Sequence, residues 1–455
     1  MDAPIDRLSA GDLMQRAMEV GPLPMHIGAV LVLSGADPVA VRAALAERIP
    51  GVVRLRRRLM HTPPGCGRPV WVDDTTFDIA RHVTTVECEA PGDEDALLRT
   101  AVPWYTTPLP SDRPLWRAVV VTGLRGGEVA LVLVLHHVLA DGIGGLAVLT
   151  SLVDGAPTPA PVPFPTPAPS RRTLATDAWA ARLRAGARVR AGVRGARAAT
   201  TELGRGRPPK VEPSSLLRPL HAELRIALTR VDLAALRGAA KAHGATINDA
   251  VLVAVTGALR DLLARRGEQV SHLVVSVPVT GRPADAVGPA EARDPARPAE
   301  TTGNRVGIMP VRLRTAGEPL ERLAEVAALT RARKGSVRGT SAAISGPVFR
   351  LLGALGILRW LVRHQRMVST FVTNVRGPAQ RPSFAGAEVA DVIPLGMVSG
   401  NVTVAFTVFS YAGTLTVAIA ADPTWCTDLD VLQGLLQQAL DELAHPLPSD
   451  GSPGD

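Results

Sequence analysis

Two adjacent histidines, His136 and His137, end an apolar run, and Asp141 and Gly142 follow them after three intervening residues. An imidazole can take a proton from a hydroxyl group near neutral pH. The pattern therefore predicts a general base beside a carboxylate, at a point where the chain turns. The alternative is a buried strand that ends in two hydrogen-bonded histidines. The complete pattern has a chance occurrence on the order of one in a thousand, which favours function over this alternative.

The element that must position these side chains is residues 129–135, a run of seven apolar residues. Such a run predicts a strand that is buried on both faces. Because successive strand side chains point to opposite faces, only one of His136 and His137 can face a given cavity. This argues against a shared metal ion, and we expect no metal at the site. The glycines between Gly142 and Gly145 predict a turn into an apolar helix.

The pattern of two histidines, three variable residues, aspartate and glycine resembles the signature of coenzyme A-dependent acyltransferases related to chloramphenicol acetyltransferase. Condensation domains of peptide synthetases share this signature. Pro114-Leu115-Trp116 and Asn248-Asp249 narrow the resemblance to the bifunctional wax ester synthase/diacylglycerol acyltransferase family. Further matching segments follow in order along the chain, at residues 8–12, 24–28, 77–78, 82–83, 303–306 and 373–378.

The resemblance implies an α/β (α+β) fold with two chloramphenicol acetyltransferase-like subdomains. Each would be a mixed sheet with flanking helices, and the two would meet at a central cleft or tunnel. The alternation of strand and helix patterns in both halves agrees with this fold. We expect an N-terminal subdomain over residues 1–155, a linker over 156–215 and a C-terminal subdomain over 216–455. A chain of 455 residues is long enough for two domains.

The resemblance also implies an O-acyltransferase that moves a fatty acyl group from acyl-CoA to a long-chain alcohol or diacylglycerol. His137 would be the general base, and the product would be a wax ester or triacylglycerol. Acyl-CoA would be a co-substrate, and no cofactor is implied. We expect no covalent acyl-enzyme, since the sequence lacks a Gly-x-Ser-x-Gly nucleophile motif.

The remaining candidate residues have supporting roles. Asp141 is expected to fix the turn through a cationic or hydrogen-bonding partner, with Arg282 as one candidate. Gly142 would let the backbone turn closely enough to leave room for substrate, and His136 is expected to be structural. For Asn248 and Asp249 two interpretations stay open. They cap a helix N-terminus, or they contribute to the substrate site as the resemblance implies.

The linker divides into two parts of different composition. Residues 156–170 contain seven prolines, which predict an extended segment. Residues 171–210 contain eleven basic and two acidic residues, a net charge of +9 against +8 for the whole chain. With Trp179 as its one aromatic residue, this segment lacks any nucleic-acid motif, and we expect no nucleic-acid partner. It predicts peripheral contact with an anionic membrane or lipid droplet, and a solvated linker is the alternative.

Other features bear on partners and location. Arg54, Arg56, Arg57 and Arg58 predict either a solvated helix end or a contact for the phosphates of coenzyme A. We find no export signal and no apolar run of the roughly 20 residues that span a membrane, and three scattered cysteines give no disulfide framework. A cytoplasmic protein is expected, either free or peripheral to the inner membrane or lipid droplets. We expect a monomer or a homodimer.

The chain also departs from the family pattern. The segment at 108–113 has Pro110 near the position where the family commonly has Leu-Asp-Arg, and aromatic residues make up only 3% of the chain. These departures leave two alternatives to wax ester or triacylglycerol synthesis. One is the same chemistry on a specialised-metabolite acceptor, with a carrier-protein donor. The other is a catalytically silent lipid-binding or lipid-droplet surface protein.

Overall fold

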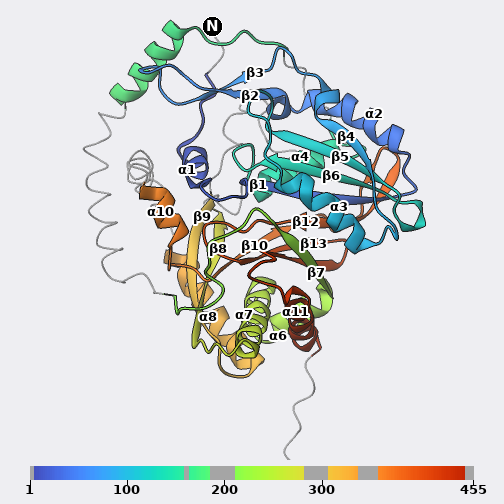
Figure 1. Cartoon of the computed structure of the whole chain (residues 1–455), viewed down its shortest axis with the longest axis vertical. Coiled ribbons are helices and arrows are strands. Elements are labelled where there is room, and N and C mark those ends of the chain that lie inside the picture. The colour runs from blue at the N-terminus through green and yellow to red at the C-terminus, as the bar shows by residue number, and fades with distance from the viewer. Residues whose placement is uncertain (1–4, 158–162, 185–210, 281–305, 337–356, 446–455) are drawn as a thin grey trace, which may run out of the picture.

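Two six-stranded sheets form the centre of the molecule (Figure 1). This computed structural model describes residues 5–157, 163–184, 211–280, 306–336 and 357–445. The first sheet has the strand order β11-β12-β1-β6-β5-β4, and its strands are β1 (His26–Ser34), β4 (Val83–Glu87), β5 (Trp116–Thr122), β6 (Val129–His136), β11 (Ser383–Phe384) and β12 (Ala387–Leu395). Its strands are antiparallel except for the parallel pair β4 and β5.

The second sheet has the order β7-β14-β13-β10-β8-β9. Its strands are β7 (Arg225–Asp232), β8 (His272–Thr280), β9 (Val306–Arg314), β10 (Thr370–Arg376), β13 (Val404–Tyr411) and β14 (Thr414–Ala421). Strand β10 is parallel to both of its neighbours, and the other pairs are antiparallel. Both sheets are therefore mixed, and the predicted α/β architecture of two subdomains is confirmed.

Helices cover the outer surfaces of the sheets (Figure 1). Helices α6, α7, α8 and α11 lie on the outer side of the second sheet, where their leucines and valines share one hydrophobic core with it. Along the described parts of the chain, the helices include α1 (Ala10–Met18), α2 (Pro38–Arg48), α3 (Glu94–Thr106), α4 (Gly142–Leu152), α6 (Leu233–Ala242), α7 (Ile247–Arg265), α8 (Pro319–Ser336), α10 (Ile357–Arg363) and α11 (Leu429–Ala444).

The strand expected to carry the histidines is β6, and every residue in it is buried. It pairs antiparallel with β5, as the glycine turn at residues 126 and 127 predicts. The alternating apolar pattern of residues 217–228 predicts a strand there, but β7 begins only at Arg225, so the predicted start is wrong. Pro213 and Pro219 lack the backbone N–H that a strand donates, so the preceding segment remains a loop.

Two strands of the first sheet, β11 and β12, come from the second half of the chain. β12 pairs with β1 over seven residue pairs, including Gly28 with Leu395. A shared hydrophobic core adds to this connection, since it contains Val132 from the first sheet and Leu228 and Ala418 from the second. The two subdomains are therefore joined both by hydrogen bonds between strands and by apolar packing. The boundaries expected at residues 155 and 215 stay a prediction, and residues 383–395 cross between the sheets.

The arginines at 54–58 do not form a solvated helix end, so that expectation is wrong. They lie in a short 3-10 helix and in β2 (Arg57–Met60), which pairs with β3 (Val70–Asp73). Arg54 and Arg57 form ion pairs with Asp6, and Arg57 also pairs with Asp73 at 2.9 Å. Arg56 is buried. The half-buried carboxylate of Asp6 and the buried carboxylate of Asp73 hold the basic cluster against the protein.

Candidate active site

His136 and His137 diverge at the end of β6, as the alternation of strand side chains requires. The backbone N–H of His137 donates to the carbonyl of Met25 at 2.8 Å, which extends the pairing of β6 with β1 by one residue. His137 lines a cavity between the two subdomains, whereas His136 turns away from it. The expectation that one histidine faces a cavity and the other packs is therefore confirmed.

The ring of His136 is held by two hydrogen bonds. Its Nδ1 accepts from the backbone N–H of Val138 at 3.1 Å, so the ring hydrogen lies on Nε2 and is donated to Glu19 at 3.2 Å. Burial alone would raise the pKa of Glu19. The bonds from His136 and from the Met25 N–H outweigh it and keep the pKa below its ordinary value. His136 is thereby fixed in one orientation beside the reactive position.

The ring of His137 is largely surrounded by protein but remains partly accessible through the cavity. Burial lowers its pKa, because the charged imidazolium loses hydration. A hydrogen bond to its own backbone and the negative charge of Asp141 oppose this effect, and the positive form of His136 adds to it. The net effect lowers the pKa of His137 and favours the neutral imidazole, which is the form that can accept a proton.

Asp141 is the N-cap of α4, the helix that follows the histidines. Its Oδ1 accepts from the backbone N–H of Gly144 at 2.8 Å, and its carbonyl accepts from Gly145 at 2.7 Å. A cap of this kind contributes about 1 kcal/mol to helix stability. Arg282, the candidate partner of Asp141, lies outside the described residues. Within the residues described, no arginine or lysine forms an ion pair with Asp141.

Gly142 occupies the first turn of α4 at the cavity wall. A Cβ atom built there would lie 3.0 Å from Cγ2 of Val375 on β10 of the other subdomain. The glycine therefore permits a close approach between the two halves next to His137, and its role in leaving room for substrate stays a prediction. Gly28 on β1 permits a close approach within the first sheet, because a Cβ there would lie 2.9 Å from the carbonyl oxygen of Leu133 on β6.

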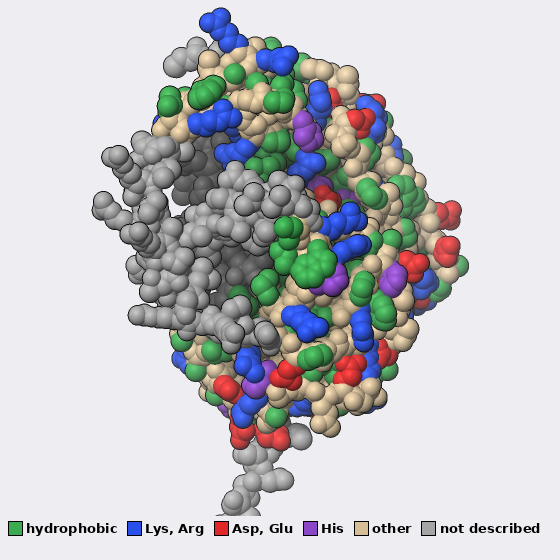
Figure 2. Space-filling view, turned by 60° about the vertical axis from the view of Figure 1, so that its left-hand side comes forward, with side chains coloured by type: hydrophobic (Ala, Val, Ile, Leu, Met, Phe, Trp, Pro, Cys, Tyr) green, Lys and Arg blue, Asp and Glu red, His purple; other side chains and the backbone are tan. Residues whose placement is uncertain are grey.

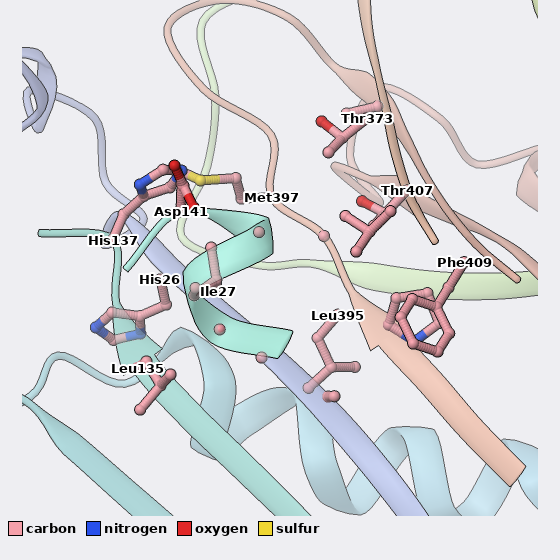
Figure 3. A pocket seen from close by; sticks show the side chains of 18 of the residues that line it. His26, Ile27, Leu135, His137, Asp141, Thr373, Leu395, Met397, Thr407 and Phe409 are labelled. Atoms are coloured by element: carbon pink, nitrogen blue, oxygen red, sulfur yellow. The ribbon is translucent and has the colours of Figure 1, made fainter. Parts of the chain in front are cut away.

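The cavity has a volume of about 280 Å³ and is lined mainly by apolar side chains. Figure 3 shows His137, Asp141 and Met397 on one side, with Thr373 and Thr407 across from them. The two threonines are register partners on β10 and β13. The lining comes from both sheets, the segment after β12 and two helices, including Ile27, Leu135, Leu146, Leu149, Phe371, Leu395 and Phe409. The site is thus a largely apolar cavity with one imidazole in its wall.

Comparisons with known proteins agree with this geometry. The sequence model of the wax ester synthase/diacylglycerol acyltransferase catalytic domain matches residues 8–251, and that of the C-terminal domain of the same family matches residues 302–444. The chain belongs to this family. It is 31% identical over 438 residues to the probable diacylglycerol O-acyltransferase tgs1 of Mycobacterium tuberculosis H37Rv, covering 92% of this chain and 91% of that protein. It is 32% identical over 452 residues to a second putative enzyme of that kind from the same strain.

Solved structures show the same fold. The wax ester synthase/diacylglycerol acyltransferase from Marinobacter aquaeolei VT8 superposes with a TM-score of 0.66 at 22% identity, covering 96% of this chain and 98% of that one. The first condensation domain of the calcium-dependent antibiotic synthetase superposes with a TM-score of 0.61 at 22% identity, covering 98% and 97%. The chain is an acyltransferase with a condensation-domain-like fold.

The motifs that narrowed the family lie away from the cavity. Asp249 completes a capping box at the N-terminus of α7: its Oδ2 accepts from the Thr246 backbone N–H at 2.8 Å, and its Oδ1 accepts from the Thr330 hydroxyl at 2.8 Å. Capping is therefore confirmed for Asp249. Neither Asn248 nor Asp249 lines the cavity, so the structure does not bring them together with His137.

Trp116 of the Pro-Leu-Trp segment is a packing residue. It is fully buried, its indole N–H donates to the Leu55 carbonyl at 2.6 Å, and its ring stacks on His82 at 4.4 Å.

Among the described residues, the cysteines are all free and buried, and no cluster of His, Cys, Asp or Glu could hold a metal ion. None of the described helices is long and apolar enough to cross a membrane.

Sequence reasoning missed two residues that organise the site. Glu19 holds His136 from the end of α1, and Tyr105 of α3 brackets His26. The Tyr105 hydroxyl donates to the His26 carbonyl at 2.8 Å, and His26 Nδ1 donates to the Tyr105 carbonyl at 2.7 Å. These contacts join segments that are distant in sequence, and a single sequence carries no signal for such pairs. His26 itself belongs to a segment that matched the family.

Proposed function

We propose that the protein transfers a fatty acyl group from acyl-CoA to the hydroxyl group of a long-chain alcohol or diacylglycerol, with His137 as the general base. One observation carries this proposal: His137 stands in the wall of an apolar cavity, with its pKa held below the ordinary value by burial. An apolar cavity suits an acyl chain, and a neutral imidazole suits a hydroxyl nucleophile. Relatives named as diacylglycerol O-acyltransferases support the same reaction class.

The mechanism follows from the tautomer of His137. Its Nδ1 is the ring atom that can reach the residue's own carbonyl, so Nδ1 carries the hydrogen and Nε2 keeps a lone pair. Nε2 takes the proton from the acceptor hydroxyl as that oxygen attacks the thioester carbonyl. The carbon–sulfur bond then breaks, and the imidazolium returns the proton to the departing thiolate. An ester and free coenzyme A leave, and no acyl-enzyme forms.

Asp141 supports this cycle through its charge. The imidazolium that forms after proton abstraction is stabilised by the nearby carboxylate, whose charge raises the pKa of His137. Burial acts in the opposite direction and returns the ring to its neutral form. The two effects together suit a group that must accept and release one proton in each turnover.

The test is thiol release from palmitoyl-CoA by the full chain, with and without hexadecanol or dioleoylglycerol, and with the products identified by mass. We expect acceptor-dependent ester formation that falls by about 10²-fold or more in His137→Ala. His243→Ala, a change of an exposed histidine, is the matched control. Ester formation that survives in His137→Ala would overturn the assignment of the base, and no ester with either acceptor would overturn the substrate assignment.

A second class of acceptor is favoured by the size of the cavity. About 280 Å³ lies just below the range of roughly 300–1,000 Å³ for ligand sites. A specialised-metabolite hydroxyl would fit the same catalyst, with a donor on coenzyme A or on a carrier protein. A screen of short and cyclic alcohols with octanoyl-CoA and palmitoyl-CoA would separate the two acceptor classes by their kcat/KM values.

We also propose that the basic segment contacts an anionic lipid surface. Its described part is a helix over residues 171–184, whose Leu174 and Ala178 are buried against the first subdomain. Trp179 and Leu183 are 61% and 72% exposed, and the guanidinium of Arg182 lies 5.4 Å from the Trp179 ring centroid. Exposed apolar residues beside arginines suit the membrane interface. Co-sedimentation with phosphatidylglycerol vesicles, compared with phosphatidylcholine vesicles, should weaken in a Trp179→Ser/Leu183→Ser variant.

A further inference from the structure

A second cavity, with a volume of about 420 Å³, lies beside the C-terminal end of α10. Three arginines line it: Arg218 from the loop before β7, and Arg363 and Arg366 from the end of α10 and the turn after it. Basic side chains border a hydrophobic patch on the face of the molecule that Figure 2 shows. Unlike the cavity at His137, this one is polar, and the reaction described above uses none of its residues.

The carboxylates in this cavity are already occupied by hydrogen bonds to backbone. Glu212 accepts from the backbone N–H of Ser271 at 2.7 Å, and Glu268 accepts from the backbone N–H of Ser215 at 2.7 Å. Burial alone would raise the pKa of Glu212, but its bonds from Ser271 and its proximity to His272 lower it. Both carboxylates therefore hold backbone segments of the cavity wall, and among the described residues neither forms an ion pair with Arg218, Arg363 or Arg366.

The arginines remain available to a ligand. Arg218 lies over the ring of Trp425, with 5.6 Å between its guanidinium carbon and the ring centroid. Within the described parts of the chain, neither Arg363 nor Arg366 forms an ion pair with a carboxylate. The Ser214 hydroxyl also lines the cavity, and it is buried without a hydrogen-bond partner among the described residues. Guanidinium groups and a hydroxyl together make a donor set that fits a phosphate.

A short segment after β12 connects this cavity to the reactive histidine. Ser399 lines the first cavity and Asn401 lines the second. The Ser399 hydroxyl lies 3.9 Å from the sulfur of Met25, whose carbonyl holds the backbone of His137. Between them, Gly400 has a φ of +69° and passes so close to α10 that a Cβ atom would lie 2.9 Å from the Val362 carbonyl oxygen. The two cavities are therefore neighbours along one wall of the molecule.

We propose that this second cavity, with Arg363, Arg366 and Arg218, binds the phosphate groups of the acyl donor. The inference rests on the proposed function, in which the donor is a coenzyme A thioester. That molecule carries its phosphates at one end and its thioester at the other, joined by a flexible arm. The arginine-lined cavity would take the phosphates. The neighbouring apolar cavity, with His137 in its wall, would take the thioester and the acyl chain. The cluster at 54–58 does not offer such a site, because Arg54 and Arg57 already pair with Asp6 and Asp73.

The experiment compares two donors with the same thioester, one with and one without the phosphate-bearing nucleotide of coenzyme A. Palmitoyl-CoA and S-palmitoyl-pantetheine, which carries no phosphate, are each assayed with hexadecanol. We expect the Arg363→Ala/Arg366→Ala variant to reduce the ratio of kcat/KM for palmitoyl-CoA to that for S-palmitoyl-pantetheine by about tenfold or more, because charged hydrogen bonds are lost. Arg359→Ala is the matched control, since Arg359 lies on the same helix and does not line the cavity. A ratio unchanged from wild type overturns the proposal.

A binding measurement separates this inference from the acyltransferase proposal. Calorimetry with adenosine 3′,5′-bisphosphate, which reproduces one end of coenzyme A, needs no turnover. We expect the wild type and Arg359→Ala to bind it equally, and the double variant to bind it at least tenfold more weakly. Equal binding by all three proteins overturns the phosphate site even if esters form. If no protein makes ester but the difference in binding persists, the reaction assignment fails and the phosphate site stands.

Lipid headgroups share phosphate chemistry with the acyl donor, so a third measurement distinguishes these sources. The double variant is sedimented with phosphatidylglycerol vesicles beside wild type. The double variant could lose vesicle binding while its ratio of kcat/KM for palmitoyl-CoA to that for S-palmitoyl-pantetheine stays unchanged. That result would assign the arginines to a membrane surface and overturn the donor site. We expect unchanged vesicle binding together with a reduced ratio of the two kcat/KM values.

Discussion

Stability between pH 7 and pH 4.5 should depend strongly on His26, a buried histidine on β1. Burial lowers its pKa from 6.5 to about 4, with further lowering by His136 and Arg117 and partial opposition from its bond to Tyr105. Its Nδ1 donates to the Tyr105 carbonyl at 2.7 Å, and its Nε2 has no partner among the described residues. The folded protein therefore holds this ring in the neutral form across the physiological range.

The size of the effect follows from proton linkage. Between pH 6.5 and about 4 the unfolded chain binds a proton at His26 that the folded protein does not, so stability falls as the pH falls through that window. The difference between the two pKa values corresponds to about 3 kcal/mol, at about 1.4 kcal/mol for each tenfold change. Most of this loss is complete by pH 4.5, and none of it occurs above pH 7.

The assay is denaturant unfolding of wild type and His26→Gln at pH 7 and at pH 4.5. Glutamine keeps a donor for the Tyr105 carbonyl but cannot titrate. We expect the loss of unfolding free energy between the two pH values to be about 2–3 kcal/mol smaller in His26→Gln than in wild type. His243→Gln, at an exposed position, should match wild type. Equal losses in wild type and His26→Gln would refute the assignment of the pH dependence to this ring.

Three further perturbations test the site and the packing around it. Asp141→Asn keeps a capping oxygen but removes the charge that raises the pKa of His137, so the acid limb of the kcat/KM profile should move to lower pH, and an unmoved limb would contradict this. Gly142→Ala places a methyl group 3.0 Å from Val375 and should lower the unfolding free energy by about 1 kcal/mol or more, measured by denaturation. Arg230→Met removes the ion pairs that β7 makes with carboxylates of the first sheet and of α3, and should lower the thermal unfolding temperature more at low salt than at high salt.

Local patterns predicted much of the fold. Residues 129–135 read as a buried strand because branched apolar residues fill every position, and β6 is buried throughout. The helix over 38–48 begins at a capping aspartate with proline at its first turn and matches α2 at both ends. At the site, the alternation of strand side chains was enough to separate the roles of His136 and His137.

Contacts between distant segments could not be predicted. β12 joins the first sheet by pairing with β1, although more than 350 residues separate them. The position of Glu19 beside His136 also depends on tertiary structure, because 117 residues separate the two in sequence. The sequence favoured a solvated helix end for the arginines at 54–58, because clusters of basic side chains usually face water. Their partners Asp6 and Asp73 become neighbours only when β2 and β3 pair.

The crossover of β12 also determines how the cavity is held open. Val392, Pro394 and Leu395 of β12 line the cavity, and the same strand is hydrogen-bonded to β1 of the opposite subdomain. The distance between this wall and Ile27 on β1 is therefore fixed by strand pairing, which tolerates little variation. The facing wall of β10 and β13 belongs to the second sheet, and near His137 it meets the first subdomain where Val375 of β10 packs against Gly142 of α4. Widening of the cavity for a longer acyl chain must then come from side chains and from the second sheet, since the paired strands cannot separate without losing their hydrogen bonds.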